Sequence, residues 1–482
     1  MGITWNVVAP TSKRRWFRGV GTAGAVAVLS TTIAATGVAV VLHRDVLPAP
    51  VGVGASPWFA DPGAAPDGSP TLPDLASVEQ VVNTAPALLM GATGQGIDVA
   101  VLDSGVTPVA GLSASNKVVY GPDLSFDSQT SAAYLDGYGH GTVIASIIGG
   151  NDGTAGGFQG VAPGARIISV KVGASNGAVD VSQIIAGIDW VTAHAHDPGM
   201  NIRVLNISLG TDSTQSYQSD PLAHAAEAAW RNGIVVVAAV GNTGSATRTL
   251  ADPAADPYVM AVGSEDPVGT IITTDDVVSP FSARGTSERR PDIVAPGSYV
   301  LGLRAPGSTL DLQYPAARVG DRYLRGSGTS QATAVVSGAV ADVLSARPNL
   351  TPDRVKKLFK KSATSISGGS NYIGAGLINV GAAVGTSVGN DAVQTWTPSP
   401  GAGSLELARG STHVASSGVT LTGEQDIFGN PWSAKVAAAE ETGTAWTGGT
   451  FNGATWSGAT WSGATWSGAT WSGATWSGAT WS

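Results

Sequence analysis

The 482-residue sequence contains no cysteine. This absence excludes disulfide bonds, thiolate zinc sites and cysteine nucleophiles, so catalysis would have to use hydroxyl, carboxylate and imidazole groups. Charged residues are also scarce, at 13% of the chain, whereas hydrophobic residues make up 43%, a balance that excludes wholesale disorder. The net charge of −9 is not typical of a protein with a basic surface for DNA or RNA, so we predict no nucleic acid partner.

The N-terminus has the pattern of an export signal. Basic residues within 13–18 precede an uncharged apolar stretch, residues 19–42. As a helix this stretch would reach about 36 Å, enough to cross a hydrocarbon core of about 30 Å. The pair Arg14 and Arg15 resembles that of a twin-arginine export signal. Residues 1–47 are therefore predicted to be a signal peptide or a membrane anchor. In both cases we expect the residues that follow to lie outside the cytoplasm.

The middle of the chain has the pattern of an α/β domain. Residues 48–80 are rich in proline and glycine and are predicted to be a linker. Over residues 81–385, short apolar runs alternate with amphipathic helical patterns, which predicts a doubly wound, mostly parallel sheet with helices on both faces. The expected strands cover residues 97–102, 166–172, 202–208, 234–240 and 258–263, and the expected helices cover 140–149, 180–196, 221–232 and 330–346, with a further helix capped by Thr351.

The C-terminal residues form a repeat with a period of five. Eight aromatic positions recur from Trp446 to Trp481, mostly within the sequence Trp-Ser-Gly-Ala-Thr. This repeat, residues 444–482, resembles a pentapeptide-repeat β-helix, and an extended segment that displays tryptophans fits it equally well. Its role is open between contact with a cell wall or surface and a flexible spacer. Residues 386–443 are predicted to be a linker or a small β segment.

Three segments carry groups that can cooperate in catalysis. Asp103 ends an expected strand, His140 opens an expected helix between two glycines, and Ser330 stands at a helix start after a glycine-rich approach. Strand ends and helix starts converge at one edge of a parallel sheet, where ligands bind. A serine hydroxyl needs a base to become a nucleophile, histidine supplies that base near neutral pH, and a buried aspartate orients the histidine. We therefore predict a triad of these residues.

The segments around the triad resemble the subtilisin-like serine peptidase family. The chain order Asp-His-Ser matches this family and differs from that of the α/β-hydrolases. The matching segments are Val99–Val106, Gly139–Thr142 and Gly326–Ala332, and the resemblance covers about residues 81–384. It implies a subtilisin-like fold and an exported serine endopeptidase that hydrolyses peptide bonds through an acyl-enzyme. Protein or peptide substrates are the implied partners, and no cofactor is required for the chemistry.

The same resemblance implies further site residues. Asn242, in a segment that ends an apolar strand, is implied to donate a hydrogen bond to the tetrahedral oxyanion. Ser208, Leu209 and Gly210 are implied to pair with an extended substrate as an added strand.

A third group of residues is implied to form the pocket for the P1 side chain, which precedes the cleaved bond. Ala239, Val240 and Gly241 are implied to line one wall, with Ala251 near the floor. Because these residues are uncharged and mostly small, we predict a preference for large apolar P1 side chains. A negative charge on the nearby Asp252 would oppose this preference.

Metal ligands are unknown from the sequence. The family often binds calcium, and Asn151 and Asp152 lie near where one such site usually forms, but acids with EF-hand-like spacing are absent. A structural calcium therefore stays open. Two alternatives to a secreted peptidase also stay open: a processing peptidase attached to the outer face of the cell membrane by residues 19–42, and an inactive peptidase fold that carries the Trp repeat as an adhesion module.

Overall fold

The computed structural model describes residues 74–441, except 248, 412 and 417–418, and three short strands between residues 446 and 455. The predicted leader, most of the linker that follows it and most of the Trp repeat lie outside the described residues. Within the described part of the chain, every helix is too short or too polar to span a bilayer.

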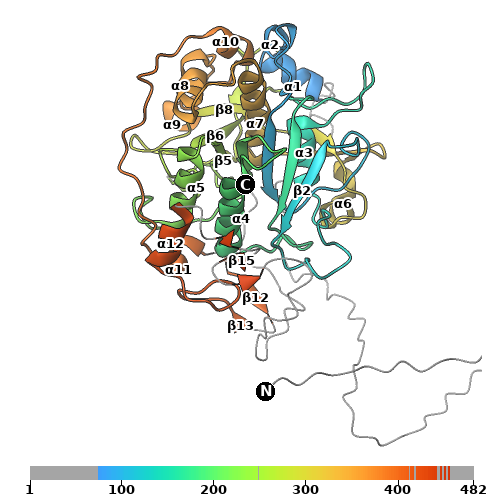
Figure 1. The fold of residues 1–482 in the computed structure, drawn as a ribbon. Coiled ribbons are helices and arrows are strands. Elements are labelled where there is room, and N and C mark those ends of the chain that lie inside the picture. Colours follow the sequence, from blue (N-terminus) through green and yellow to red (C-terminus); the bar gives the residue numbers. More distant parts are fainter. Residues whose placement is uncertain are drawn as a thin grey trace, which may run out of the picture. The chain divides into compact units, whose positions relative to one another are not determined.

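An eight-stranded sheet forms the centre of the fold (Figure 1). Its strand order is β2-β3-β1-β4-β5-β6-β7, with β8 also paired to β6, and the pairing is parallel except between β6 and β7. The predicted α/β fold with a mostly parallel sheet is confirmed. The strands are β1 (Asp98–Asp103), β2 (Val118–Asp123), β3 (Arg166–Lys171), β4 (Ile202–Ile207), β5 (Val235–Ala239), β6 (Met260–Asp266), β7 (Val277–Val278) and β8 (Ile293–Pro296).

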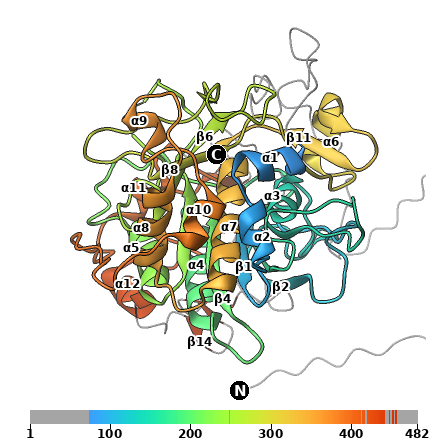
Figure 2. The same ribbon diagram turned by 90° about the horizontal axis from the view of Figure 1, so that it is seen from above.

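Helices pack on both faces of this sheet (Figure 2). Strands β1 and β5 are buried along their whole length, as apolar strands between two helical layers should be. Helices α3 and α7 pack together on one side, and α4 and α5 pack together on the other. The main helices are α3 (His140–Gly149), α4 (Val181–His194), α5 (Pro221–Arg231), α7 (Thr329–Ala346) and α8 (Pro352–Ser362).

The remaining elements are short. A second, antiparallel sheet contains β9 (Val300–Leu303), β10 (Arg318–Val319) and β11 (Tyr323–Gly326). The short helices are α1 (Leu75–Val81), α2 (Ala85–Leu89), α6 (Thr309–Gln313), η2 (Pro315–Ala317), α9 (Ser370–Ile373) and α10 (Val380–Gly385).

Residues beyond 385 also join the core. The region left open between a linker and a small β segment contains α11 (Leu405–Arg409), α12 (Ala434–Glu441) and the paired strands β12 (Ala415–Ser416) and β13 (Val419–Thr420). Leu405 and Ala408 are buried within the same hydrophobic cluster as the central sheet.

The described part of the Trp repeat pairs as antiparallel strands, β14 (Trp446–Thr447), β15 (Thr450–Phe451) and β16 (Ala454–Thr455). Antiparallel pairing differs from the stacked coils expected of a β-helix.

The topology places the ligand-binding edge at β1 and β4. The chain leaves β1 toward β2 and β3 on one side, and β4, β5 and β6 follow on the other. In open α/β sheets ligands bind at the carboxyl ends of the strands where the order reverses. Asp103 is the last residue of β1, and Ser208 directly follows β4.

Candidate active site

The structure brings the Asp103 carboxylate to the imidazole ring of His140. Nδ1 of His140 lies 2.9 Å from both Oδ1 and Oδ2 of Asp103. Both side chains are buried, with His140 3% and Asp103 0% exposed. Because an ionised carboxylate only accepts hydrogen bonds, Nδ1 carries the proton of this contact. Nε2 is then the ring nitrogen that can take up a further proton.

Ser330 is the second residue of α7, which packs against the helix that begins at His140. Ser330 Oγ donates to the backbone oxygen of Ser208 at 3.1 Å, and Ser208 Oγ donates to the backbone oxygen of Ser330 at 3.1 Å. This reciprocal pair holds the start of α7 against the end of β4. The first N–H groups of a helix lack intrahelical acceptors, so the start of α7 presents N–H donors and the positive end of the helix dipole.

Asn242 lies after β5, beside the start of α7. Its Oδ1 accepts hydrogen bonds from the N–H of Thr329 at 2.9 Å and from the Thr329 hydroxyl at 3.0 Å. These bonds occupy the carbonyl end of the amide, so the NH₂ group is the end that can donate elsewhere. A Cβ built on Gly328 would lie 3.5 Å from Asn242 Nδ2, which places this nitrogen beside the backbone that leads into Ser330.

A second buried carboxylate, Asp136, connects the ends of β1 and α3. Its Oδ1 accepts from the N–H of Gly139 at 2.6 Å and from the Ser104 hydroxyl at 2.7 Å, and its Oδ2 accepts from the N–H of Thr142 at 2.7 Å. The N–H of Ser104 in turn donates to Asp103 Oδ1 at 2.7 Å. Burial raises the pKa of Asp136, and its hydrogen bonds oppose that rise. Asp136 thus joins the two elements that carry the histidine and its carboxylate.

Lys171, at the end of β3, supports the same turn. Its side chain is 1% exposed, and Nζ donates to the backbone oxygens of Ser104 at 3.0 Å and Leu135 at 2.7 Å. The sequence does not single out Lys171 or Asp136, because their contacts join distant positions. The one available signal is that Asp136 shortly precedes a helix start, where acids are favoured.

The predicted substrate-binding residues lie at the carboxyl ends of two neighbouring strands. Residues 208–210 follow β4, and residues 239–241 end or follow β5, its parallel neighbour. A Cβ built on Gly210 would lie 3.0 Å from Ala251 Cβ, and one built on Gly241 would lie 3.2 Å from it. The structure therefore brings both glycines and Ala251 together.

Asp252 follows Ala251 and is 4% exposed. Burial raises the pKa of Asp252 well above its usual range, and the nearby carboxylate of Asp220 raises it further. Asp220 accepts from the N–H of Leu222 at 2.7 Å, as the cap of α5. Asp252 therefore holds a proton more readily than an exposed aspartate, which weakens its negative charge beside the predicted P1 pocket.

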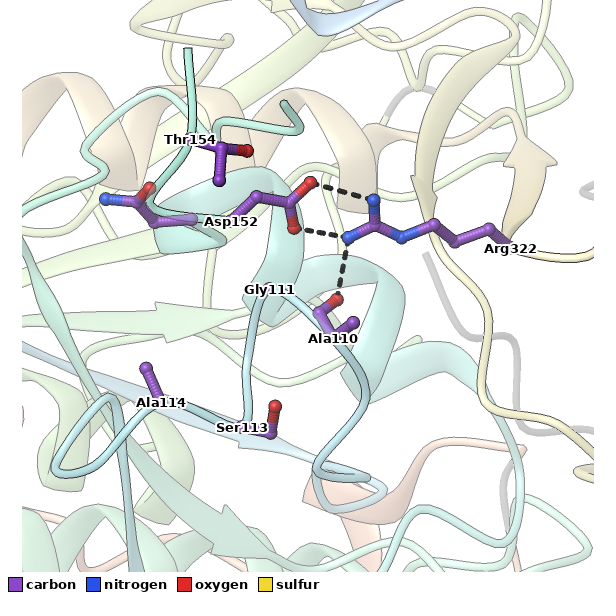
Figure 3. Close-up of a pocket in the computed structure, with 8 residues that line it drawn as sticks. Ala110, Gly111, Ser113, Ala114, Asp152, Thr154 and Arg322 are labelled. Atoms are coloured by element: carbon purple, nitrogen blue, oxygen red, sulfur yellow. Dashed lines mark hydrogen bonds and ion pairs between the residues drawn. The ribbon is translucent and has the colours of Figure 1, made fainter. Parts of the chain in front are cut away.

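The segment predicted to lie near a calcium site does not fit one. Both carboxylate oxygens of Asp152 pair with the guanidinium of Arg322 (Figure 3). Asn151 Oδ1 accepts from the N–H of Gly153 at 2.7 Å. Among the described residues, no three or more His, Asp or Glu side chains are grouped so that they could hold a metal ion. The Arg322 guanidinium therefore already neutralises the Asp152 carboxylate, which a calcium ion would need as a ligand.

Asp152 and Arg322 also line a cavity of about 440 Å³, together with Ala110, Gly111, Ser113, Ala114, Asn151 and Thr154 (Figure 3). None of these lining residues belongs to the predicted triad or to the predicted substrate-binding residues. The cavity is therefore separate from the candidate active site.

Comparison with known proteins decides the family. The profile of the subtilase family matches residues 94–395, more than half of the chain. The chain belongs to the subtilase family. This subtilase is 37% identical over 295 residues to the serine protease AprX of Bacillus subtilis, covering 60% of this chain and 66% of AprX. It is 35% identical over 295 residues to subtilisin DY of Bacillus licheniformis, covering 61% of this chain and 92% of that relative.

A solved structure also resembles the subtilase chain. Fervidolysin from Fervidobacterium pennivorans, a keratinolytic enzyme related to subtilisin, matches with a TM-score of 0.52 and 27% identity. The match covers 65% of this chain and 46% of fervidolysin, so the chain spans less than half of that relative and slightly less than two thirds of AprX. These relatives indicate a serine-type endopeptidase, and subtilases need no cofactor for their chemistry.

Proposed function

We propose that this subtilase is an exported endopeptidase with Ser330 as nucleophile, His140 as general base and acid, and Asp103 as the group that orients the histidine. The observation that carries the proposal is the pair of 2.9 Å contacts between His140 Nδ1 and the Asp103 carboxylate. This pair is buried at a strand end, and the helix that begins at His140 packs against the helix that bears Ser330.

The reaction proceeds through an acyl-enzyme. Ser330 Oγ turns from the Ser208 carbonyl and attacks the scissile carbonyl carbon, while its proton passes to Nε2 of His140. The carbon–nitrogen bond then breaks, and His140 returns the proton to the leaving amine. Water attacks the acyl-enzyme with His140 again as base, and the carboxylic acid leaves as Ser330 regains its proton. Asp103 stays ionised and offsets the imidazolium charge.

Asn242 and the start of α7 supply the donors for the tetrahedral oxyanion. Because Thr329 holds the carbonyl end of the Asn242 amide, Nδ2 is the donor of this side chain. The N–H of Ser330, in the first turn of α7, is the second donor. One such donor raises kcat by about 10²- to 10³-fold, the range known for the oxyanion asparagine of a subtilisin.

The substrate binds as an extended strand along the backbone of residues 208–210. Ser208 and Leu209 have buried side chains, so backbone groups make the pairing. The P1 side chain enters between Gly210 and Gly241, toward Ala251. No charged side chain among these residues favours lysine or arginine, so a peptide library should give cleavage after large apolar residues. A profile dominated by basic P1 residues would contradict this specificity.

The proposed export rests on the basic and apolar leader within residues 1–47. Cell fractionation tests it and separates its two forms. Protein found in the medium indicates a cleaved leader, whereas activity retained in the membrane fraction and exposed to added substrate indicates the anchored form. Activity confined to the cytoplasm would contradict export.

The peptidase proposal is tested by the hydrolysis of unfolded casein and of a chromogenic peptide. We expect Ser330→Ala and His140→Ala each to lower kcat by about 10⁴-fold or more. His196→Ala is the matched control, because His196 is an exposed histidine with no predicted role. Equal losses in all three variants, or full activity in His140→Ala, would contradict the assignment.

A further inference from the structure

Residues 397–441, as far as they are described, form a C-terminal segment that packs against the peptidase domain. Helices α11 and α12 of this segment lie beside α5 (Figure 1), and α11 also packs against α4. The segment begins after residue 395, where the match to the subtilase family ends. Its contacts are polar as well as apolar, and two of them are fully buried.

The first buried contact is an ion pair between Arg409 and Asp180. Both side chains are 0% exposed, and Arg409 Nε donates to Asp180 Oδ2 at 2.7 Å. Asp180 also caps α4, since its Oδ1 accepts from the N–H of Ser182 at 3.0 Å. Replacement of either side chain alone would leave the other charge buried without its partner, which is strongly unfavourable. The pair therefore joins α11 of the segment to the start of α4.

The second buried contact joins the segment to α5. Glu227 accepts from the N–H of Ser399 at 2.9 and 3.0 Å. The two ring nitrogens of His224 lie 2.7 Å from the backbone oxygen of Ser399 and 3.0 Å from that of Ala437. One histidine thus contacts both ends of the segment, so the segment is held along its length.

Between these attachments, α11 contacts Thr211, the residue after the substrate-pairing backbone of residues 208–210. The Thr211 hydroxyl donates to the backbone oxygen of Ala408 at 2.6 Å, and Thr211 is 5% exposed. The Thr211 backbone pairs with Asp252, with N–H to oxygen distances of 3.0 and 2.9 Å. Thr211 follows Gly210, and a Cβ on Gly210 would lie 2.8 Å from the backbone oxygen of Asp252. Thr211 is therefore bonded to the segment through its side chain and, through its backbone, to Asp252, the residue after Ala251.

The next residue makes a parallel contact. Asp212 Oδ1 accepts from the N–H of Ser411 at 2.7 Å, and Asp212 Oδ2 accepts from the Ser411 hydroxyl at 2.6 Å. Gly410, with φ of +60°, allows this approach, because a Cβ there would lie 2.1 Å from Asp212 Oδ1. The two residues after the substrate-pairing backbone are thus both bonded to the C-terminal segment.

We propose that the C-terminal segment positions the substrate-pairing backbone of residues 208–210, and that Thr211 is the positioning residue through which it acts. The inference rests on the proposed function, since it concerns the binding of an extended substrate. It assigns residues 397–441 a role in substrate binding rather than the role of a linker. The effect should appear in KM for long peptides, which use the paired backbone, and not in the reactivity of Ser330.

The test compares Thr211→Val with Thr211→Ser in the full chain. Valine keeps the shape of the side chain and removes the donor to Ala408, whereas serine restores the donor. For Thr211→Val we expect KM for an extended peptide to rise about threefold to tenfold, as for the loss of one buried hydrogen bond. KM for a single-residue ester, kcat, and the rate of Ser330 labelling by a fluorophosphonate should stay within twofold of wild type. Thr211→Ser should return KM for the extended peptide toward the wild-type value.

Two further variants keep the result clear if Thr211→Val folds poorly. Ser411→Ala removes an exposed hydroxyl of the segment that bonds to Asp212, and it should raise KM for the extended peptide in the same direction. Ser213→Ala is the matched control, because its hydroxyl donates to Asp220 instead of the segment. Unchanged KM in both Thr211→Val and Ser411→Ala, or an equal rise in Ser213→Ala, would overturn the inference. Absence of peptide cleavage by the wild type would instead overturn the proposed function.

Discussion

Replacement of Asp136 by asparagine tests how the His140 helix is held. Asp136 accepts from Gly139 at 2.6 Å, from Ser104 at 2.7 Å and from Thr142 at 2.7 Å. In Asp136→Asn the remaining oxygen can keep the first two bonds, but the new NH₂ group faces the N–H of Thr142. One charge-assisted hydrogen bond is lost, and a buried donor is left unsatisfied, so we expect the free energy of unfolding to fall by about 2–3 kcal/mol.

The same change should lower activity, because α3 begins at the residue after Gly139. Loss of the Thr142 bond lets the first turn of α3 shift, and the His140 ring moves with it. A displacement of about 1 Å costs about 10²-fold in rate, so kcat should fall about 10- to 100-fold in Asp136→Asn. KM should change by less than about threefold, because Asp136 does not line the proposed binding edge. Steady-state peptide hydrolysis, normalised by active-site titration, measures both constants.

Asp123→Asn is the matched control for this prediction. Asp123 is also buried and also accepts three hydrogen bonds, two from Ser125 at 2.9 and 2.6 Å and one from Tyr134 at 2.7 Å. These hydrogen bonds reach Ser125 and Tyr134, which lie outside α3, so we expect a similar loss of stability with kcat unchanged. A kcat within twofold of wild type in Asp136→Asn, or an equal fall in Asp123→Asn, would refute the reasoning.

Three further predictions follow from the described contacts. Asn242→Ala should lower kcat by about 10²–10³ with little change in KM in peptide hydrolysis, and an unchanged kcat would exclude Asn242 from the oxyanion site. Burial raises the pKa of Asp276 from 3.8 to about 7. The native state should therefore lose stability as pH rises from about 4 to about 7, because the unfolded chain ionises this carboxyl group more readily. Asp276→Asn should therefore raise Tm more at pH 8 than at pH 4, and Asp275→Asn should show a smaller difference in the same direction, because the Asp275 carboxylate also raises the pKa of Asp276. An equal shift of Tm at both pH values in Asp276→Asn would contradict this prediction. Arg322→Ala should lower the free energy of unfolding by about 1 kcal/mol, since the ion pair with Asp152 is partly exposed; no change in thermal unfolding would show that the pair contributes nothing.

The sequence predicted the parts of the site that local pattern determines. Helix α3 covers the predicted residues 140–149, because its buried apolar residues form one uninterrupted pattern after the glycine at 139. The expected cap of α8 is confirmed, since the Thr351 side chain accepts from the N–H of Arg354. The five expected strands lie within a few residues of β1, β3, β4, β5 and β6.

The parts that the sequence did not predict depend on contacts between distant positions. Asp136 bonds to Ser104, 32 residues away, and Lys171 bonds to the same residue from 67 residues away. A buried lysine or aspartate resembles an exposed one in the sequence until the fold supplies its partners. The buried ion pair of Arg409 was not predictable for the same reason, since its partner Asp180 lies 229 residues away and α11 is only a short helix.

Every step of the proposed reaction depends on Ser330 as an activated nucleophile. Intact-protein mass spectrometry of the exported protein, with and without a fluorophosphonate probe, detects that activation. We expect a single adduct on Ser330 that is absent from both Ser330→Ala and His140→Ala. An adduct that persists in Ser330→Ala, or a folded wild-type protein that cleaves peptides without being labelled at Ser330, would contradict it.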